Sequence, residues 1–180
     1  MSPSLPKRDR RPGFSAADAI TVARLPLAVA FIIFPAVEVR LVLLTLAAAT
    51  DLGDGIVARR FGASRIGAVL DPIVDKLFMA AAFGVVAFSG TLFWYEVVGV
   101  LLRDIFASAA FFLTRGGGNR PAVPARLGGK AVTLLQLLTL LAFLLEAPQL
   151  RPLAWATTAV ALYALWDYSR LFFQSNEDRS

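Results

Sequence analysis

The sequence of 180 residues contains no cysteine and no histidine. Without cysteine the chain forms no disulfide and has no thiolate nucleophile, and without both residues it lacks the usual ligands of a zinc site. The absence of histidine also removes the side chain that enzymes most often use as a general base. Any metal or acid–base chemistry must therefore come from carboxylates and basic side chains.

Charged residues are scarce as well: they make up 17% of the chain, whereas hydrophobic residues make up 57%. Ordinary soluble domains are about half apolar and about a quarter charged. Six apolar stretches, each close to the roughly 20 residues that a membrane span needs, cover residues 18–37, 39–58, 67–89, 92–113, 130–146 and 152–173. The sequence therefore predicts an all-α integral membrane protein with six transmembrane helices.

These stretches use nearly the whole chain, which predicts a single membrane domain over residues 1–180 with no separate soluble domain. Residues 1–16 form a basic segment before the first stretch, and we expect this segment to lie on the anionic membrane surface. A disordered tail is the alternative interpretation of it. The first stretch is too long for a signal peptide and lacks a small-residue cleavage site.

The net charge of +5 does not indicate a nucleic-acid partner, because the basic residues are spread over short loops and not gathered on one face. Most of them lie before the first stretch, between the second and third, between the fourth and fifth, and after the sixth. The opposite loops carry only Arg40 and Arg151 as cations. This asymmetry predicts a multi-pass protein of the cell membrane with both termini and the basic loops in the cytoplasm.

Four aspartates lie near the predicted cytoplasmic ends of the second and third stretches: Asp51, Asp54, Asp71 and Asp75. An ionisable side chain at the bilayer centre costs about 3 kcal/mol, so four of them indicate a function. Spacings of three and four residues place each pair on one face of a helix. Carboxylate oxygens suit Mg²⁺ or Mn²⁺, and Mg²⁺ usually keeps coordination places for substrate phosphates. We therefore expect a metal site that binds a diphosphate.

Other interpretations of these residues stay open. A cation transporter or channel would also place aspartates on membrane helices, although the sequence shows no internal repeat of the inverted-repeat transporter kind. A structural membrane protein without catalysis would be plausible only if one aspartate were replaced. The small residues Gly53, Gly55, Ala58 and Gly67 permit close approach of a nucleotide, and packing between helices is the alternative.

The segments Asp51-Leu-Gly-Asp54-Gly55-Ile-Val-Ala58-Arg59 and Gly67-Ala-Val-Leu-Asp71-Pro-Ile-Val-Asp75 resemble the signature of the CDP-alcohol phosphotransferase family. All eight signature residues are present, and the spacer between Arg59 and Gly67 is one residue shorter than is common in the family. The resemblance implies a six-helix fold, usually homodimeric. It also implies that a CDP-alcohol lies over the metal ions and that CMP leaves when an acceptor hydroxyl attacks the β-phosphorus.

The resemblance also implies a role for each matching position. Two divalent ions, Mg²⁺ or Mn²⁺, would be held by Asp51, Asp54 and Asp71, with Asp75 at the metal edge and acting as the general base. CDP would be bound by Asp51, Asp54, Gly55, Ala58, Arg59 and Gly67. Thr21 and Arg24 resemble a Thr-x-x-Arg segment near the start of such synthases, which implies contact with the nucleotide or the lipid phosphate.

Around Asp71, at Arg103-Asp104 and at residues 129–136, the chain is most similar to the phosphatidylglycerophosphate synthase branch, in which CDP-diacylglycerol reacts with glycerol 3-phosphate. That branch usually has glutamate at the position of Asp104 and often lysine at that of Val132. Cardiolipin synthase, which uses phosphatidylglycerol, and phosphatidylinositol-phosphate synthase therefore stay open as alternatives. Candidates for binding the acceptor phosphate are Arg103, Arg126 and Lys130, for which anchoring of the topology is the other interpretation.

Overall fold

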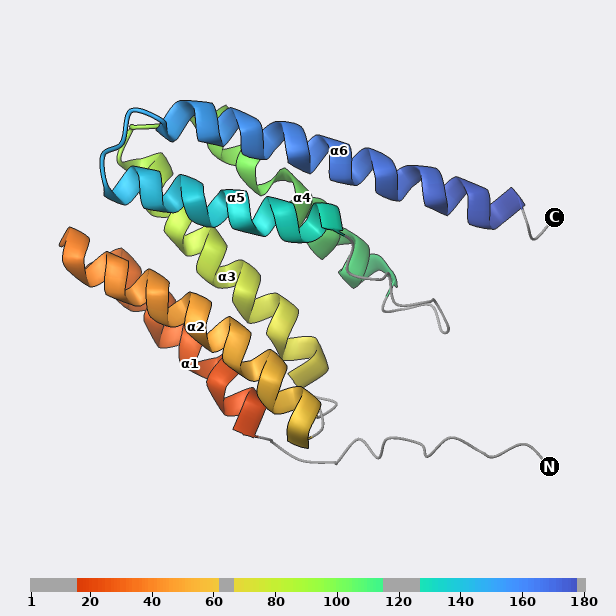
Figure 1. The fold of residues 1–180 in the computed structure, drawn as a ribbon, viewed down its shortest axis with the longest axis horizontal. Coiled ribbons are helices and arrows are strands. Elements are labelled where there is room, and N and C mark those ends of the chain that lie inside the picture. The colour runs from red at the N-terminus through yellow and green to blue at the C-terminus, as the bar shows by residue number, and fades with distance from the viewer. Residues whose placement is uncertain (1–15, 62–66, 115–126, 178–180) are drawn as a thin grey trace. The chain divides into compact units, whose positions relative to one another are not determined.

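The structure is a computed structural model that describes residues 16–61, 67–114 and 127–177, with side chains described for 18–51, 53, 70, 73–109 and 128–167. These ranges contain six α-helices and no strand (Figure 1). The helices are α1 (Ala16–Ile33), α2 (Val37–Phe61), α3 (Gly67–Phe88), α4 (Trp94–Thr114), α5 (Leu127–Leu144) and α6 (Leu150–Glu177). The predicted all-α class and the number of helices are confirmed.

Each helix falls on one of the predicted apolar stretches, with ends that differ by a few residues. Residues 89–90 and 147–148 lie between helices, and Gly90 has a φ of 73°, the left-handed conformation that often ends a helix. Within the described parts of the chain, no helix combines the length and the apolar character that a membrane crossing requires.

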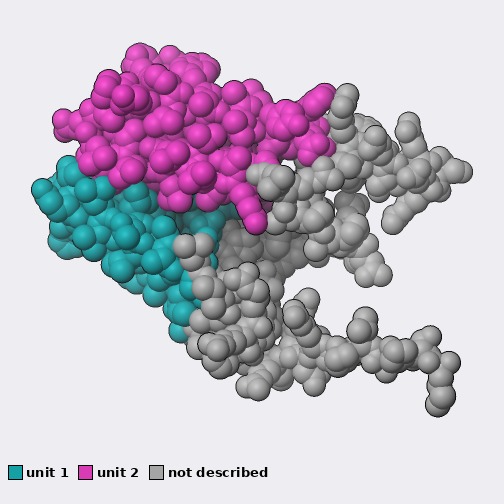
Figure 2. Space-filling view, in the orientation of Figure 1, with its two compact units in different colours: residues 1–82 teal, residues 83–180 magenta. Residues whose placement is uncertain are grey.

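The chain divides into two compact units, Met1–Ala82 and Phe83–Ser180 (Figure 2). α3 contributes its residues up to 82 to the first unit and the remainder to the second. The predicted single membrane domain over residues 1–180 stays a prediction.

In the first unit, α1 and α2 pack against each other. The buried core joins Phe31 of α1 to Phe78 of α3, whose rings meet edge to face with centroids 5.9 Å apart. Arg40 covers Phe31 from α2: its guanidinium carbon is 5.5 Å from the ring centroid, and its Nε donates a hydrogen bond to the Phe31 carbonyl. That carbonyl belongs to the last turn of α1, where carbonyl groups lack partners within the helix. Arg40 therefore caps the end of α1.

In the second unit, α6 packs against both α4 and α5. A buried hydrogen bond of 3.1 Å joins the hydroxyls of Thr139 and Thr157 between α5 and α6. Between α4 and α6 the contact is closer, because a Cβ atom added to Gly99 would lie 2.6 Å from the Thr158 hydroxyl oxygen. Glycine at residue 99 therefore lets the two helices approach.

Glu96 joins the start of α4 to the start of α6. Its carboxylate is buried, accepts a hydrogen bond of 2.9 Å from the Phe93 backbone N–H, and lies 4.0 Å from Nε of Arg151. The Arg151 guanidinium also stacks over the Phe93 ring, 4.9 Å from its centroid. Because Phe93 directly precedes α4 and Glu96 is its third residue, this is one half of a capping box.

Replacing Glu96 by alanine should lower the free energy of unfolding by about 1–2 kcal/mol, because the helix loses a cap and Arg151 loses its carboxylate partner. Thermal unfolding followed by circular dichroism measures the effect. Glu96→Gln is the matched control, since its amide oxygen still accepts the bond from Phe93, and it should lose less stability. Equal melting temperatures for wild type and Glu96→Ala would contradict this role.

Candidate functional site

The four aspartates of the predicted metal site come from two consecutive helices of the first unit. Asp51 and Asp54 lie in α2, and Asp71 and Asp75 lie in α3. The structure describes the side chains of Asp51 and Asp75, whereas those of Asp54 and Asp71 lie outside the described side chains. Among the described residues, no group of three or more acidic side chains is close enough to hold a metal ion. Convergence of all four carboxylates therefore stays a prediction.

Asp51 has a basic partner inside the protein. Its Oδ1 lies 3.4 Å from Nη1 of Arg24, whose side chain is 2% exposed while that of Asp51 is 54% exposed. Nε of Arg24 donates a hydrogen bond of 3.2 Å to the hydroxyl of Thr50, which in turn donates to the Ala47 carbonyl. A buried guanidinium is costly unless it is paired and hydrogen-bonded. These contacts offset that cost and hold Asp51 at the edge of the unit, open to solvent.

Arg24 belongs to a polar row on one face of α1. Asp18, Thr21 and Arg24 are spaced three residues apart and are all buried. Below them the same helix buries Ala28 and Phe31, so the inner face of α1 changes from polar to apolar along its length. The predicted contact of Thr21 with CDP stays a prediction, and the structure places Thr21 on the buried face next to Arg24.

The remaining predicted nucleotide residues lie on the same two helices. Gly55, Ala58 and Arg59 follow Asp54 in α2, and Gly67 is the first residue of α3. Their side chains lie outside the described ones, so their roles stay predictions. All of them belong to the first unit, with the four aspartates.

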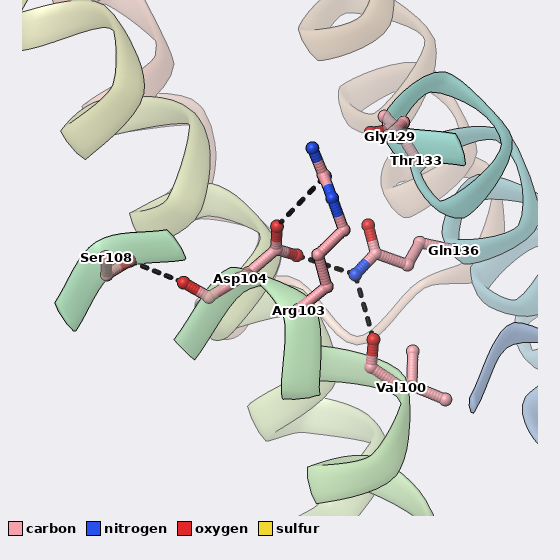
Figure 3. A network of polar contacts seen from close by, with 7 residues as sticks. All are labelled: Val100, Arg103, Asp104, Ser108, Gly129, Thr133 and Gln136. Carbon is pink, nitrogen blue, oxygen red and sulfur yellow. Dashed lines mark hydrogen bonds and ion pairs between the residues drawn. The ribbon is translucent and has the colours of Figure 1, made fainter. Parts of the chain in front are cut away.

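A second polar cluster lies in the second unit, between α4 and α5 (Figure 3). Asp104 lies at its centre: Oδ1 is 3.6 Å from Nη1 of Arg103, and Oδ2 accepts a hydrogen bond of 2.6 Å from Nε2 of Gln136. The same Gln136 nitrogen donates to the Val100 carbonyl at 3.0 Å. Gln136 is 1% exposed, so the amide is a buried link between the two helices.

This cluster contains one of the three cations predicted to bind the acceptor phosphate. The Arg103 side chain is 30% exposed and lies against Gly129, and the exposed Lys130 is the next residue of α5. Arg126 lies outside the described residues. Within its apolar stretch, Arg103 forms an ion pair with Asp104. Anion binding by these cations stays a prediction.

Sequence reasoning missed two of these contacts. It did not pair Arg24 with Asp51. The spacing of Asp18, Thr21 and Arg24, three residues apart within an apolar stretch, was a signal that one polar face of this helix is buried. Sequence reasoning also gave no role to Gln136, a lone amide within a leucine-rich run, whose surroundings predict a buried partner.

Comparison with known proteins places these features in a family. The sequence model described as CDP-alcohol phosphatidyltransferase matches residues 14–166, a range that includes all four aspartates and the Arg103 cluster. The resemblance inferred from the aspartate signature is thereby confirmed. No solved structure matches the chain.

Named relatives fall into more than one group. A probable phosphatidylglycerophosphate synthase of Mycobacterium tuberculosis H37Rv is 33% identical over 117 residues, which cover 64% of this chain and 54% of the relative. A putative cardiolipin synthase of the same strain is 36% identical over 92 residues, 51% of this chain and 44% of the relative. A CDP-diacylglycerol–glycerol-3-phosphate 3-phosphatidyltransferase of Sodalis glossinidius is 36% identical over 102 residues, 55% of this chain and 56% of the relative. The chain thus spans about half the length of these curated relatives.

Proposed function

Because the chain belongs to the CDP-alcohol phosphatidyltransferase family, we propose that it transfers a phosphatidyl group from CDP-diacylglycerol to glycerol 3-phosphate. The products are phosphatidylglycerophosphate and CMP. The observation that carries the proposal is the family match, which extends over the whole aspartate signature. Relatives named for phosphatidylglycerophosphate synthesis support this acceptor.

The reaction is a substitution at phosphorus. The acceptor hydroxyl oxygen forms a bond to the β-phosphorus, the bond from that phosphorus to the bridging oxygen breaks, and CMP leaves with the electron pair. The hydroxyl proton passes to the carboxylate of Asp75, which is half-buried in α3. A carboxylate beside metal ions is a weak base, so Asp75 acts mainly by orienting the hydroxyl and receives the proton late. No covalent intermediate with the protein is needed.

The residues present fit a divalent metal site. The donor set consists of four carboxylates, the chemistry that Mg²⁺ and Mn²⁺ prefer, and the Asp51 side chain is more than half exposed. We assign Asp51, Asp54, Asp71 and Asp75 to hold two divalent ions. When bound, the ions neutralise the diphosphate and the leaving CMP. Arg24 restrains Asp51 from the buried side through the ion pair.

The nucleotide would lie along α2 and the start of α3. Gly55, Ala58 and Gly67 carry little or no side chain, which leaves room for the backbone to approach CDP. Arg59 would contact a phosphate, and Thr21 of α1 would support the same region.

We further propose that the protein resides in the cell membrane, where its lipid substrate is found, with six transmembrane helices and with both termini and the active site facing the cytoplasm. Both units support this, because large apolar side chains are exposed on them; these include Val29, Ile32, Ile33, Phe34, Ile105, Phe106, Leu134, Trp155, Leu162 and Trp166. Contiguous exposed apolar surface marks contact with membranes or partners. The excess of cations in the loops assigned to the cytoplasm supports the orientation. A homodimer, usual in the family, is part of the proposal.

The acceptor phosphate would be bound by Arg103, Lys130 and Arg126. The Arg103 side chain is partly exposed. Lys130, which follows Gly129 in α5, is exposed. Both side chains therefore offer N–H donors to an anion.

Replacement of Lys130 by alanine should raise the KM for glycerol 3-phosphate about tenfold and leave kcat nearly unchanged, because a charge-assisted bond to the phosphate is lost. Initial rates of CMP release at varied acceptor concentration give both constants. Lys130→Arg keeps the charge and should stay close to wild type. An unchanged KM in Lys130→Ala would contradict phosphate binding by Lys130 and leave anchoring of the membrane topology as its role.

Cardiolipin synthesis, with phosphatidylglycerol as the acceptor, is the second candidate function. It is favoured by the relative named as a putative cardiolipin synthase, which is 36% identical over its matched residues. Phosphatidylinositol-phosphate synthesis is a further alternative within the family. A cation transporter or channel is the alternative of a different class, and it predicts ion flux in liposomes without any dependence on a nucleotide.

One experiment separates these functions. Purified protein receives CDP-diacylglycerol and Mg²⁺ or Mn²⁺, then in turn glycerol 3-phosphate, phosphatidylglycerol, inositol 1-phosphate or serine, and CMP release is measured. We expect release with glycerol 3-phosphate. Release with phosphatidylglycerol instead would identify a cardiolipin synthase, and absence of CMP release with every acceptor would contradict the transferase.

A further inference from the structure

The guanidinium of Arg103 occupies space that only glycine leaves open at residue 129. A Cβ atom added to Gly129 would lie 2.5 Å from Nη2 and 3.2 Å from Cζ of Arg103. Real Cβ atoms essentially never approach a heavy atom within 3.0 Å. The guanidinium therefore rests on the backbone of α5, and any larger residue at position 129 must displace it.

Asp104 contacts the same guanidinium at its other terminal nitrogen, and Gln136 in turn contacts Asp104. Asp104 approaches Nη1 of Arg103 through one carboxylate oxygen and accepts the Gln136 amide with the other. Gln136 is held in place by its second bond, to the Val100 carbonyl (Figure 3), and its side chain is buried. A buried amide with two partners restricts Asp104 to one orientation, and Asp104 in turn restricts Arg103.

An arginine held in this way is prepared to bind an anion. A guanidinium has five N–H donors, more than the contact with Asp104 uses, and it matches a phosphate with two parallel hydrogen bonds. Fixing a long side chain beforehand reduces the entropy lost when the ligand binds. The Arg103 side chain is still 30% exposed, and the next residue after Gly129 in the sequence, Lys130, is an exposed second cation.

We propose that Gly129, Asp104 and Gln136 are positioning residues that fix Arg103 for the phosphate group of the acceptor. They would thereby make the enzyme select a phosphorylated acceptor over an unphosphorylated one. This inference rests on the proposed function. The competing explanation, that the cluster only packs α4 against α5, predicts changes in stability without a change in acceptor preference.

The test compares alanine at two adjacent glycines of α5. A Cβ atom at Gly128 would meet only Ala164, at 3.4 Å or more, so Gly128→Ala makes the same change of residue without touching Arg103. We expect Gly129→Ala to raise the KM for glycerol 3-phosphate about tenfold, with kcat and the KM for CDP-diacylglycerol nearly unchanged. Gly128→Ala should keep all three constants close to wild type. The preference for glycerol 3-phosphate over glycerol should fall in Gly129→Ala only.

Two further variants separate positioning from packing. In an Arg103→Lys background the guanidinium is absent, so Gly129→Ala should have little additional effect on the KM. Gln136→Met removes both hydrogen bonds at similar volume and should raise the KM in the same direction, which keeps the test valid if Gly129→Ala does not fold. An equal effect of Gly129→Ala in the wild-type and Arg103→Lys backgrounds would overturn the inference.

Failure of the inference differs from failure of the proposed function. Wild-type protein that releases no CMP with glycerol 3-phosphate would overturn the proposed function and this inference together. Wild-type protein that does release CMP, with the same KM in Gly129→Ala as in wild type, would overturn the inference alone.

Discussion

Asp71→Asn and Asp75→Asn should each lower the rate of CMP release by about a thousandfold or more, while the protein stays folded. Asparagine keeps the size of the side chain but removes the negative charge that binds a metal ion and the basic oxygen that receives a proton. CMP release under saturating CDP-diacylglycerol and glycerol 3-phosphate gives the rate, and circular dichroism confirms the helical content. A variant that loses CMP release but keeps its helical content has lost catalysis and not its fold.

Glu38→Gln is the matched control for these variants. Glu38 is an exposed acid in the first turn of α2, the helix that also carries Asp51 and Asp54. Glu38→Gln removes one negative charge, as the aspartate variants do, but far along α2 from Asp51 and Asp54. This variant should therefore retain wild-type turnover. Wild-type turnover in Asp75→Asn would remove the assigned role of general base.

Removal of divalent ions should have an effect of the same size. Treatment with EDTA followed by dialysis is expected to eliminate CMP release, and added Mg²⁺ or Mn²⁺ should restore it. Four carboxylates and the diphosphate of the substrate carry like charges, so without divalent ions they repel each other. Circular dichroism before and after chelation checks that the helices persist. Full activity in metal-free buffer with excess EDTA would contradict the metal site.

The helices could be predicted from the sequence because each lies on an apolar stretch bounded by turn residues. Their ends could not. The second apolar stretch was expected to end at residue 58 and the sixth at residue 173, whereas α2 continues to Phe61 and α6 to Glu177. An apolar stretch ends at the first polar residues, whereas the backbone hydrogen bonds of a helix continue through polar residues such as Arg59 and Arg60. Hydropathy therefore underestimates helices that end in polar segments.

The candidate residues could be predicted by type and spacing, but their partners could not. Asp51 stands out as one of a pair on one helix face, yet its contact with Arg24 depends on how α1 is rotated against α2. Likewise, the pattern does not show that Gln136 reaches Asp104, because the residues are 32 positions apart and belong to different helices. Such contacts follow from packing of whole helices, which local sequence patterns do not specify.

Binding of Mn²⁺ in the presence of CDP, followed by electron paramagnetic resonance, tests most directly whether the aspartates of α2 and α3 form one metal site. We predict that wild type binds two ions, that asparagine at any one of residues 51, 54, 71 and 75 weakens this binding at least about tenfold, and that Glu38→Gln does not. Unchanged Mn²⁺ binding in all four aspartate variants would contradict the shared site.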